Sequence, residues 1–518
     1  MSTKEKFIEE IKSAYTFKGD YITLGGAMYE GECINNLLVN IPLKTLNRHG
    51  LISGATGTGK TKTLQIIAEQ LSSKSIPVLL MDVKGDLSGL AKPGNTHPKI
   101  DERHNKIGFP FTPNGFPIEM LTLSQEKGTR LRATVSEFGP VLLSKILELN
   151  DTQASFVSLI FKYCDDSKLP VLDLKDFKRV LQYISDEGKA DIEKEYGKIS
   201  TTSVGTILRK VIELEQQDAD LFFGEKSFEV DDLVRIDETG RGIISIIRLI
   251  DLQDRPKMFS TFMLSLLAEI YSSFPEEGDL NQPKLVIFID EAHLIFQEAS
   301  KALLEQIETI TKLIRSKGVG IFFCTQNPTD VPASVLSQLG LKVQHALRAF
   351  TAKDRQMIKL TAENYPISEY YKTDEMLTSL GIGEAAITAL NEKGIPTPLA
   401  ATLLRAPQSR MDILNEDEID EISRDSKLVG KYNETIDRES AYEMLNRKLE
   451  VAQETEERTT TQTKRTKTTS RRTKRDKSTM EKVLTSTTTK QIGRTLAREF
   501  ARGILGVLGL GGATRRRS

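Results

Sequence analysis

The stretch Gly54-Ala55-Thr56-Gly57-Thr58-Gly59-Lys60-Thr61 decides the fold of this 518-residue chain. It matches the phosphate-binding pattern G-x-x-x-x-G-K-[ST] at every fixed position. Residues 48–55 have the character of a strand that enters a glycine-rich turn, and Thr61–Leu71 has helical apolar spacing. A buried strand is expected at Pro77–Asp82. The sequence therefore predicts a P-loop at the start of a parallel α/β sheet.

Each part of the loop has a chemical role. Glycines allow backbone N–H groups to approach phosphates, and the N-terminus of the following helix adds a positive dipole end. Lys60 is expected to place its charge on the β- and γ-phosphate oxygens, and the Thr61 hydroxyl is expected to ligate Mg²⁺. The alternative is a glycine-rich turn that fits the pattern by chance. The predicted ATP cradle comprises Gly54, Ala55, Thr56, Gly57, Thr58, Gly59, Lys60 and Thr61.

A second motif, Lys284–His293 (KLVIFIDEAH), is an apolar run that ends in two carboxylates. A buried strand of a parallel sheet would place both at the carboxyl edge, where ligands bind in α/β folds. We expect Asp290 to hold Mg²⁺ through water and Glu291 to polarise the attacking water. That adjacency favours hydrolysis over transfer to a second substrate. The alternative is a strand that ends in a solvated acidic turn.

Two further strand ends are candidates for the same site. Thr325 and Gln326 close an apolar run, and a glutamine there is suited to contact the γ-phosphate. Asp82 precedes Lys84-Gly85-Asp86 and is a candidate contact for the metal or for a bound polymer. The alternatives are a polar strand end for Gln326 and a solvated loop for Asp82.

The rest of the chain has a recognisable organisation. Four segments between 117 and 241 have helical apolar spacing, which predicts an α-helical insertion; they are Val141–Leu149, Thr152–Tyr163, Leu174–Ile184 and Val204–Leu214. Strands are expected at Gly242–Leu249, Lys284–Asp290, Gly320–Thr325, Val343–Phe350 and Glu384–Leu390, with helices at 256–273 and 297–316. The predicted domains are a short β-rich lead-in (1–47), two parts of an ATPase core (48–116 and 242–410), the insertion (117–241), an acidic helical extension (411–453), a basic Thr/Ser-rich linker (454–490) and a short amphipathic basic helix (491–518).

The net charge of −1 conceals an asymmetry. Residues 451–518 hold 17 Lys/Arg and 6 Asp/Glu, whereas the first 450 residues hold 54 and 66. A basic tail, expected to be disordered, thus follows an acidic body. It is suited to nucleic acid, an anionic surface or another copy's body, with a soluble linker as the alternative. Residues 458–477 lack aromatics, so they are not expected to stack on bases. The closing helix is a candidate to cap a ring, to self-associate or to bind a membrane.

Cysteine content and hydropathy limit the class of protein. Cys33, Cys164 and Cys324 have the spacing of neither a disulfide framework nor a zinc site, which predicts a reducing, cytoplasmic location. The longest apolar stretches are shorter than a bilayer span, and the chain does not open with a secretory signal. An integral membrane protein and a secreted scaffold are therefore not expected.

Four stretches together resemble the HerA/FtsK branch of ATPases: GATGTGKT, VLLMDVKGDLSGLA, VIFIDEAHLIF and LIRSKGVGIFFCTQNPTDVP, in this order and spacing. More narrowly, RATVSEFGPVLLSKILELNDTQ, LRAF-TAKDRQ and GIGEAAITALNEKGIPTP resemble HerA-like proteins of the YjgR type. The resemblance covers approximately residues 20–410. It implies a RecA-like fold of the additional-strand type with a mostly parallel sheet and an α-helical insertion, assembled as a ring hexamer with ATP between subunits.

The resemblance also assigns roles to individual residues. Lys60 and Thr61 are the phosphate and Mg²⁺ ligands, Asp290 and Glu291 the metal and catalytic carboxylates, Gln326 the sensor, and Arg315 an arginine finger that reaches the ATP of a neighbouring subunit. Arg348 is the rival finger, and Arg48 a candidate contact within the same subunit. A helix-terminal cation is the alternative for Arg315.

One departure from the family limits what the resemblance implies. HerA proteins carry an N-terminal β-barrel of substantial size, and only 53 residues precede Gly54 here. We therefore expect no full barrel, and docking to the nuclease partner of HerA proteins does not follow automatically.

Three functional readings remain open. The first is a ring motor that moves double-stranded DNA, with a nuclease or another protein as a candidate partner. The second is an ATPase that moves or remodels a protein, and the third is a scaffold with slow turnover. Glu291 argues against the third, and it also argues against a simple kinase. Stimulation of the ATPase by DNA would separate the first two.

Overall fold

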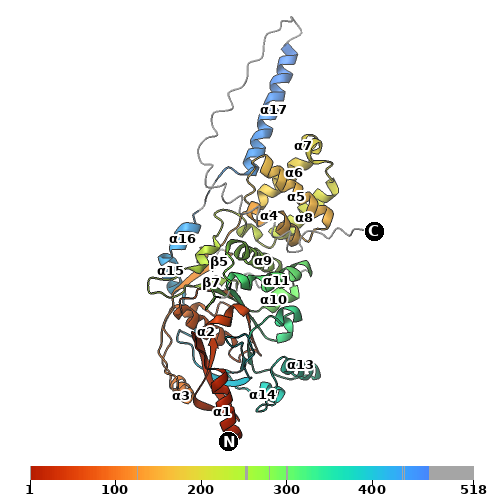
Figure 1. Cartoon of the computed structure of the whole chain (residues 1–518). Helices are drawn as coiled ribbons and strands as arrows, with labels where there is room; N and C mark the ends of the chain where they lie inside the picture. Colours follow the sequence, from red (N-terminus) through yellow and green to blue (C-terminus); the bar gives the residue numbers. More distant parts are fainter. Residues whose placement is uncertain are drawn as a thin grey trace, which may run out of the picture. The chain divides into compact units, whose positions relative to one another are not determined.

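The computed structural model describes residues 2–465, except 125, 251–254, 279, 299–300, 435 and 437. The described chain forms two compact units (Figure 1). Among the described residues, unit 1 comprises those up to 132 together with 226–434, and unit 2 comprises 133–225 together with those from 436 to 465. The closing helix predicted at 491–518 and the linker beyond 465 lie outside the described residues.

Within the described residues of unit 1, twelve strands form one sheet, in the order β2-β1-β12-β11-β10-β3-β9-β8-β4-β7-β5-β6. The strands are β1 Tyr21–Tyr29, β2 Glu32–Pro42, β3 Gly50–Ser53, β4 Val78–Asp82, β5 Ile118–Thr122, β6 Thr129–Arg130, β7 Ile244–Arg248, β8 Leu285–Ile289, β9 Val319–Thr325, β10 Leu341–His345, β11 Glu384–Thr388 and β12 Ala400–Leu404.

The sheet is mostly parallel, as the sequence predicts. Every pair from β10 to β6 is parallel, whereas the pairs that join β10, β11, β12, β1 and β2 are antiparallel. β9 lies between β3, which leads into the glycine-rich loop, and β8, so it is the additional strand. Strands β3, β4, β8 and β9 are buried along their whole length, which explains their continuous apolar runs. The expected fold class is confirmed.

Helices of unit 1 pack around this sheet. They are α1 Thr3–Ala14, α2 Lys60–Ser73, α3 Pro98–Ile107, α9 Pro256–Ser273, α10 His293–Glu298, α11 Lys301–Leu313, α12 Ala333–Leu336, α13 Ala352–Glu363, α14 Thr373–Ser379, α15 Glu416–Asp425 and α16 Lys427–Tyr432. Short 3₁₀ turns include η1 Leu43–Arg48, η2 Ser88–Ala91, η4 Val230–Val234, η6 Ile314–Lys317 and η7 Pro328–Asp330. Among the helices that the structure describes, none combines the length and apolar character that a bilayer crossing requires.

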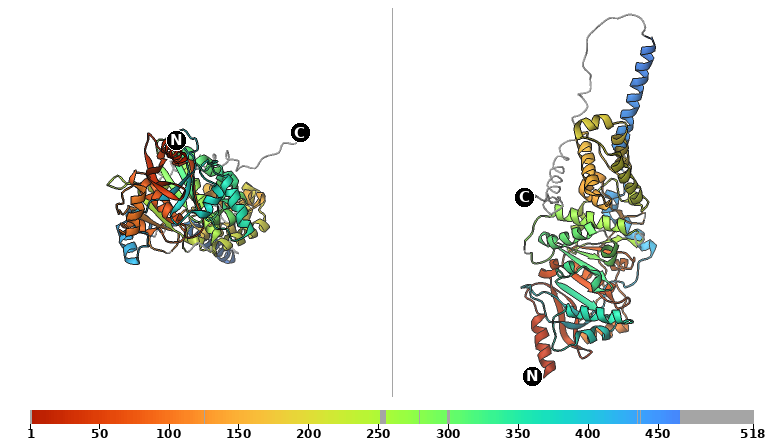
Figure 2. Two further views of the ribbon diagram at one scale, coloured as in Figure 1. Left: turned by 90° about the horizontal axis from the view of Figure 1, so that it is seen from below. Right: turned by 90° about the vertical axis from the view of Figure 1, so that its right-hand side faces the viewer.

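The N-terminal segment differs from the expected β-rich lead-in because it begins with a helix. Ser2 and Glu5 form a reciprocal capping box, and the buried faces of Phe7 and Ile11 attach α1 to the core. Figure 2 shows α1 in red beside the N-terminus. The hairpin β1–β2 then joins the main sheet through β12. Gly25 permits this pairing, since a Cβ there would lie 2.0 Å from the Leu403 carbonyl oxygen.

β10 also differs from its prediction. It begins at Leu341 and ends at His345, not at Phe350. Beyond His345 the backbone turns to other partners: Ala346 O accepts a hydrogen bond from Ala55, and Leu347 N donates to Leu377 O. The apolar pattern continues past the point where the ladder stops.

Unit 2 is helical, with narrower bounds than the predicted insertion at 117–241. Residues 117–132 and 226–241 belong to unit 1, where they supply β5, β6 and η4. Pro140 follows Gly139, whose positive φ of 75° interrupts α4, and α17 runs past the expected start of the basic linker at 454. The helices are α4 Val135–Ile146, α5 Asp151–Asp166, α6 Leu174–Ser185, α7 Lys189–Tyr196, α8 Thr201–Glu215 and α17 Ala441–Arg465, with the 3₁₀ turn η3 Ala219–Leu221.

Candidate nucleotide site

The loop between β3 and α2 has the backbone of a phosphate cradle. Gly54, Gly57 and Gly59 have positive φ angles of 149°, 77° and 114°, a region that L-residues with a Cβ rarely adopt. Gly54 is also required for space, since a Cβ there would lie 2.5 Å from the Cβ of His345. The glycines of the motif therefore set both the shape of the loop and its distance from β10.

Neighbouring elements hold the loop in place. Ala55 N donates to Ala346 O over 2.9 Å, and Gly383 N donates to Thr58 O over 3.0 Å. His345 lies against the loop with Nε2 2.8 Å from the Thr63 hydroxyl, and burial lowers the pKa of this histidine to about 4. The ring is therefore neutral near pH 7. The cradle is thus supported by β10 and by the turn before β11.

Lys60 folds back over the loop. Its ammonium donates to Gly54 O over 2.8 Å and to Ala55 O over 3.3 Å. Burial lowers the pKa of Lys60. Anionic phosphate oxygens are stronger acceptors than these carbonyls, so the ammonium is placed to exchange one set for the other. Thr61 is the next residue in the chain. It lies in the first turn of α2 and is half-buried.

The structure brings the two predicted carboxylates to this loop. Asp290 and Glu291 follow β8 directly, and both are buried beside Lys60, whose pKa responds to their charges. Burial and then the Glu291 charge raise the pKa of Asp290 to about 6, and the Cys324 thiol donates a hydrogen bond to Asp290. Oδ2 of Asp290 has no hydrogen-bond partner among the described residues.

This donor set suits Mg²⁺. The buried Asp290 oxygen that has no partner among the described residues, and the Thr61 hydroxyl in the first turn of α2, are the hard oxygen ligands that this ion prefers. The described residues contain no cluster of three or more acidic, histidine or cysteine ligands. Mg²⁺ commonly uses only one or two protein ligands and completes its shell with water and phosphate oxygens. Thr61 and Asp290 are therefore the residues that would hold it.

Glu291 has a strained backbone and forms an ion pair with a lysine. Its φ of 47° lies in the left-handed region, which is unusual for a residue with a side chain and is often found at functional sites. Oε1 pairs with the Lys84 ammonium, and Oε2 lies 3.1 Å from Nδ1 of His293. Sequence reasoning assigned no role to Lys84 or His293. The sequence did contain a signal for Lys84: it is a basic residue that follows β4, and β4 is the strand next to β8.

Asp82 does not lie free for a metal or a polymer. Its Oδ1 accepts from Gly85 N over 2.7 Å and from Asp86 N over 3.2 Å, while Oδ2 accepts from Leu87 N over 3.1 Å. Burial raises its pKa to about 7. The carboxylate therefore fixes the turn that carries Lys84, in place of the predicted contact with metal or polymer.

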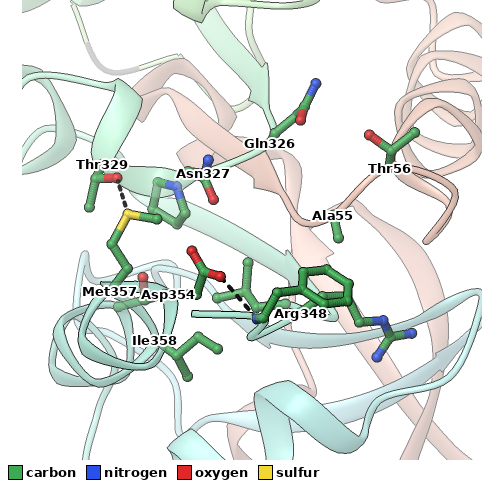
Figure 3. A pocket seen from close by; sticks show the side chains of 13 residues that line it. Ala55, Thr56, Gln326, Asn327, Thr329, Arg348, Asp354, Met357 and Ile358 are labelled. Carbon is green, nitrogen blue, oxygen red and sulfur yellow. Dashed lines mark hydrogen bonds between the residues drawn. The ribbon is translucent and has the colours of Figure 1, made fainter. Parts of the chain in front are cut away.

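Gln326 lies at the same edge of the sheet. It follows β9, is exposed, and lines a pocket of about 190 Å³ together with Ala55 and Thr56 (Figure 3). Arg348 lines the pocket too, and its Nη1 donates to Thr378 O over 3.3 Å. Phe350 on the same rim is 87% exposed. Gln326 and Arg348 are thus both placed beside the first residues of the loop.

Arg315 and Arg48 lie at the other edge. Arg315 belongs to η6, ahead of β9, and its charge acts on buried His49, ahead of β3. Because β3 and β9 are parallel, both sequence positions precede the strands, whereas the P-loop follows β3. Arg48 ends η1, and its guanidinium lies against Gly394. The structure brings neither arginine to the loop of its own chain.

Comparisons with known proteins agree with this geometry. A model of the family described as helicase HerA-like C-terminal matches residues 30–516. DNA double-strand break repair helicase HerA from Sulfolobus acidocaldarius is 24% identical over 70% of this chain and 66% of its own length. The protein with the same description from Sulfurisphaera tokodaii is 24% identical over 67% of this chain and 64% of its own length. The chain thus spans somewhat less than two thirds of these relatives.

Solved structures share the fold. The bacterial conjugative coupling protein TrwBdeltaN70, in an unbound form, superposes with a TM-score of 0.51 at 14% identity, over 79% of this chain and 95% of that one. The plasmid coupling protein TrwB in complex with the non-hydrolysable ATP analogue ADPNP gives a TM-score of 0.51 at 15% identity, over 80% of this chain and 96% of that one. At such identity the likeness concerns the fold alone.

Proposed function

Because this chain belongs to the helicase HerA-like C-terminal family, we propose that it is a Mg²⁺-dependent ATPase that assembles into a hexameric ring and moves double-stranded DNA in the cytoplasm. One observation carries the ATPase part: the P-loop cation Lys60 shares a buried site with Asp290 and Glu291. Relatives named as DNA repair helicases support the DNA part. TrwB has been solved in complex with ADP and Mg²⁺, which supports the choice of cofactors.

The residues divide the work as follows. Lys60 would leave Gly54 O and Ala55 O for phosphate oxygens, while the loop N–H groups hold the phosphates in position. Thr61 and Asp290 would hold Mg²⁺, which supplies charge neutralisation when bound. Glu291 would orient and polarise the attacking water, and Gln326 would contact the terminal phosphate. Positioning and electrostatic stabilisation, rather than covalent chemistry, are what phosphoryl transfer requires.

Arg315 can act as an arginine finger in this proposal only from a second copy. Arg315 lies at the opposite edge of the sheet from its own loop, so only a neighbouring subunit offers it a nucleotide. Such an arginine contributes about 10³- to 10⁵-fold to the rate in other systems. Arg348 is the alternative, since it lines the pocket beside Ala55 and Thr56.

A second candidate function is an ATPase that moves or remodels a protein. The observation that favours it is charge: the first 450 residues hold 54 basic and 66 acidic residues, a balance that does not attract DNA by itself. If the protein does move DNA, it must bind the DNA through local basic surfaces or through residues 451–518. A protein partner, such as a nuclease, remains a component of either proposal.

ATPase rates of the full chain test the proposal. They are measured with and without duplex DNA at low and moderate salt, alongside the mass from light scattering. Lys60→Ala should lose tight ATP binding, Glu291→Gln should bind ATP without turnover, and Arg315→Ala should bind ATP but lose hydrolysis. Lys74→Met, which removes only a surface ion pair to Asp20, is the matched control. An ATPase rate that does not change when DNA is added would contradict the proposal that the protein moves DNA. A wild-type ATPase rate in Arg315→Ala would exclude Arg315 as the arginine finger.

A further inference from the structure

The predicted general base is held in an ion pair in this structure. One oxygen of Glu291 pairs with the Lys84 ammonium, and the other lies 3.1 Å from Nδ1 of His293. Glu291 itself is buried, with a side chain only 7% exposed. A carboxylate must offer an oxygen to the attacking water in order to orient it. A cation paired with a carboxylate lowers its basicity, so Glu291 becomes a stronger base when the ion pair with Lys84 is released.

Lys84 is the contact that is built to be released. Its side chain is 41% exposed, against 7% for its partner, and it extends from the turn after β4. The base of that turn is fixed, because Asp82 accepts three hydrogen bonds from the backbone of Gly85, Asp86 and Leu87. His293, by contrast, lies only two residues from Glu291 at the start of α10. A flexible lysine on a fixed turn can move its charge while its backbone stays in place.

The surroundings of Lys84 indicate what would draw it away. Burial opposes its charge, but the pairing with Glu291 and the nearby Asp290 and Asp86 raise the pKa of Lys84. Burial lowers the pKa of Lys60, and the Lys84 charge lowers it further, so the two ammonium groups lie close enough for their charges to interact. A phosphate anion bound near Lys60 competes with Glu291 for Lys84.

We propose that Lys84 is a positioning residue that holds Glu291 out of catalysis until a phosphate anion takes over its ammonium. The inference rests on the proposed function, since it concerns the base of that reaction. Two sources offer the same chemistry: the terminal phosphate of a nucleotide in the loop and the backbone of a nucleic acid. The proximity to Lys60 favours the nucleotide. In that case ATP itself frees the base that hydrolyses it.

Steady-state kinetics of the full chain test the release. Lys84→Met removes the charge, keeps most of the side-chain volume, and is expected to raise kcat without DNA by about threefold or more, with KM for ATP changed less than about twofold. Lys84→Arg keeps a cation beside Glu291 and should fall between Lys84→Met and the wild type. Lys74→Met should match the wild type. A kcat for Lys84→Met at or below that of the wild type would overturn the inference.

Chemical labelling gives a readout that does not need turnover. Acetic anhydride acylates free lysine amines, and mass spectrometry measures the extent at Lys84 relative to exposed Lys74. We expect slow acylation of Lys84 in the wild type and faster acylation in Glu291→Gln, where the ion pair is lost. Adding a non-hydrolysable ATP analogue with Mg²⁺ to Glu291→Gln should protect Lys84 again. Protection by duplex DNA without nucleotide would identify the nucleic-acid backbone as the source.

The outcomes separate the two proposals. Equal acylation in wild type and Glu291→Gln, or no protection by either phosphate source, overturns the role of Lys84 even in an active ATPase. The expected labelling pattern in a protein that hydrolyses no ATP supports Lys84 and contradicts the proposed function. Thermal unfolding of each variant, matched to the wild type, establishes that it is folded.

Discussion

Three carboxylates converge at one edge of the sheet, and each is stabilised differently. Asp82 accepts hydrogen bonds from its own turn, and Glu291 pairs with Lys84. Asp290 keeps an oxygen that has no hydrogen-bond partner among the residues that the structure describes. The sequence predicted Asp290 and Glu291 correctly as strand-end carboxylates near the loop. It could not distinguish Asp82 from them, because all three follow apolar strands. Only the turn geometry after β4 reveals that the Asp82 acceptors are already used.

Asp82 should make stability depend on pH. Its folded pKa of about 7 lies above the usual value of 3.8, so the folded chain binds the proton more tightly than the unfolded chain. The resulting stabilisation is present below about pH 4 and is lost as the pH rises through 7. Asp82→Asn cannot titrate, so its melting temperature should fall less than that of the wild type between pH 5 and pH 8. Parallel slopes in differential scanning fluorimetry would contradict this expectation.

At the scale of elements, the strong signals came from buried parallel strands. Their continuous apolar runs predicted β4, β8 and β9 closely, and α9 matches its expected bounds of 256–273. Elements at the edges of the two units were predicted less well. Helix α1 was missed because its buried face has only Phe7 and Ile11, and the insertion was drawn too wide because β5 and β6 are short. Edge elements carry less apolar periodicity than central ones.

An interaction between elements also escaped prediction: the segment 408–411 is held along α2. The buried Glu69 carboxylate accepts from Gln408 N over 2.8 Å and from Ser409 N over 2.9 Å. Gln65 Nε2 donates to Arg410 O over 2.9 Å. These partners lie more than 300 residues apart, so no local pattern indicates them. The helix that begins at the phosphate loop is thereby connected to the chain that enters α15.

Loss of this connection should destabilise unit 1. Glu69→Ala leaves two buried backbone N–H groups without an acceptor, which costs about 2–4 kcal/mol of unfolding free energy. Glu69→Gln keeps one acceptor oxygen and should cost less. Glu102→Ala, which removes an exposed i,i+4 ion pair to Lys106, is the control and should change little. Chemical denaturation followed by circular dichroism measures the free energy of unfolding of each variant. Equal losses for Glu69→Ala and Glu102→Ala would contradict the expected stabilising role of Glu69.

At the scale of the whole molecule, the proposed site is incomplete within one chain. The sequence, through a family resemblance, pointed to a finger at Arg315 that acts between subunits. The structure adds the position of that residue at the opposite edge of the sheet from its own loop. The assembly itself stays a proposal, because a single chain does not contain its neighbour.

Mixing two inactive variants tests action between subunits. Lys60→Ala lacks a working loop but keeps its arginine, and Arg315→Ala has the reverse defect. Mixed assemblies should regain part of the ATPase rate, because an intact loop can then meet an intact finger. Arg315→Ala mixed with Lys60→Ala/Arg315→Ala has no such pairing and serves as the control. An absence of recovery in co-assembled mixtures of confirmed mass would exclude Arg315 as an intersubunit finger.

The basic residues at the end of the chain give a second prediction at this scale. Removal of residues 466–518 should leave the ATPase rate without DNA intact and weaken duplex DNA binding. It should also reduce the salt dependence of that binding, since fewer counterions are released. Fluorescence anisotropy at several salt concentrations measures both. If the salt dependence of DNA binding does not change, the DNA contacts belong to the chain before residue 466.

Strand β9 has a further consequence for communication. All seven of its residues are buried, and parallel neighbours β3 and β8 hold it on both sides. Arg315 lies just before one end and Gln326 just after the other. Seven residues of strand span about 23 Å and cannot bend independently of their neighbours. In the proposed ring, β9 would form a rigid link between the residue proposed to contact one ATP and the residue proposed to contact the next, so that a displacement at one nucleotide is transmitted to its neighbour.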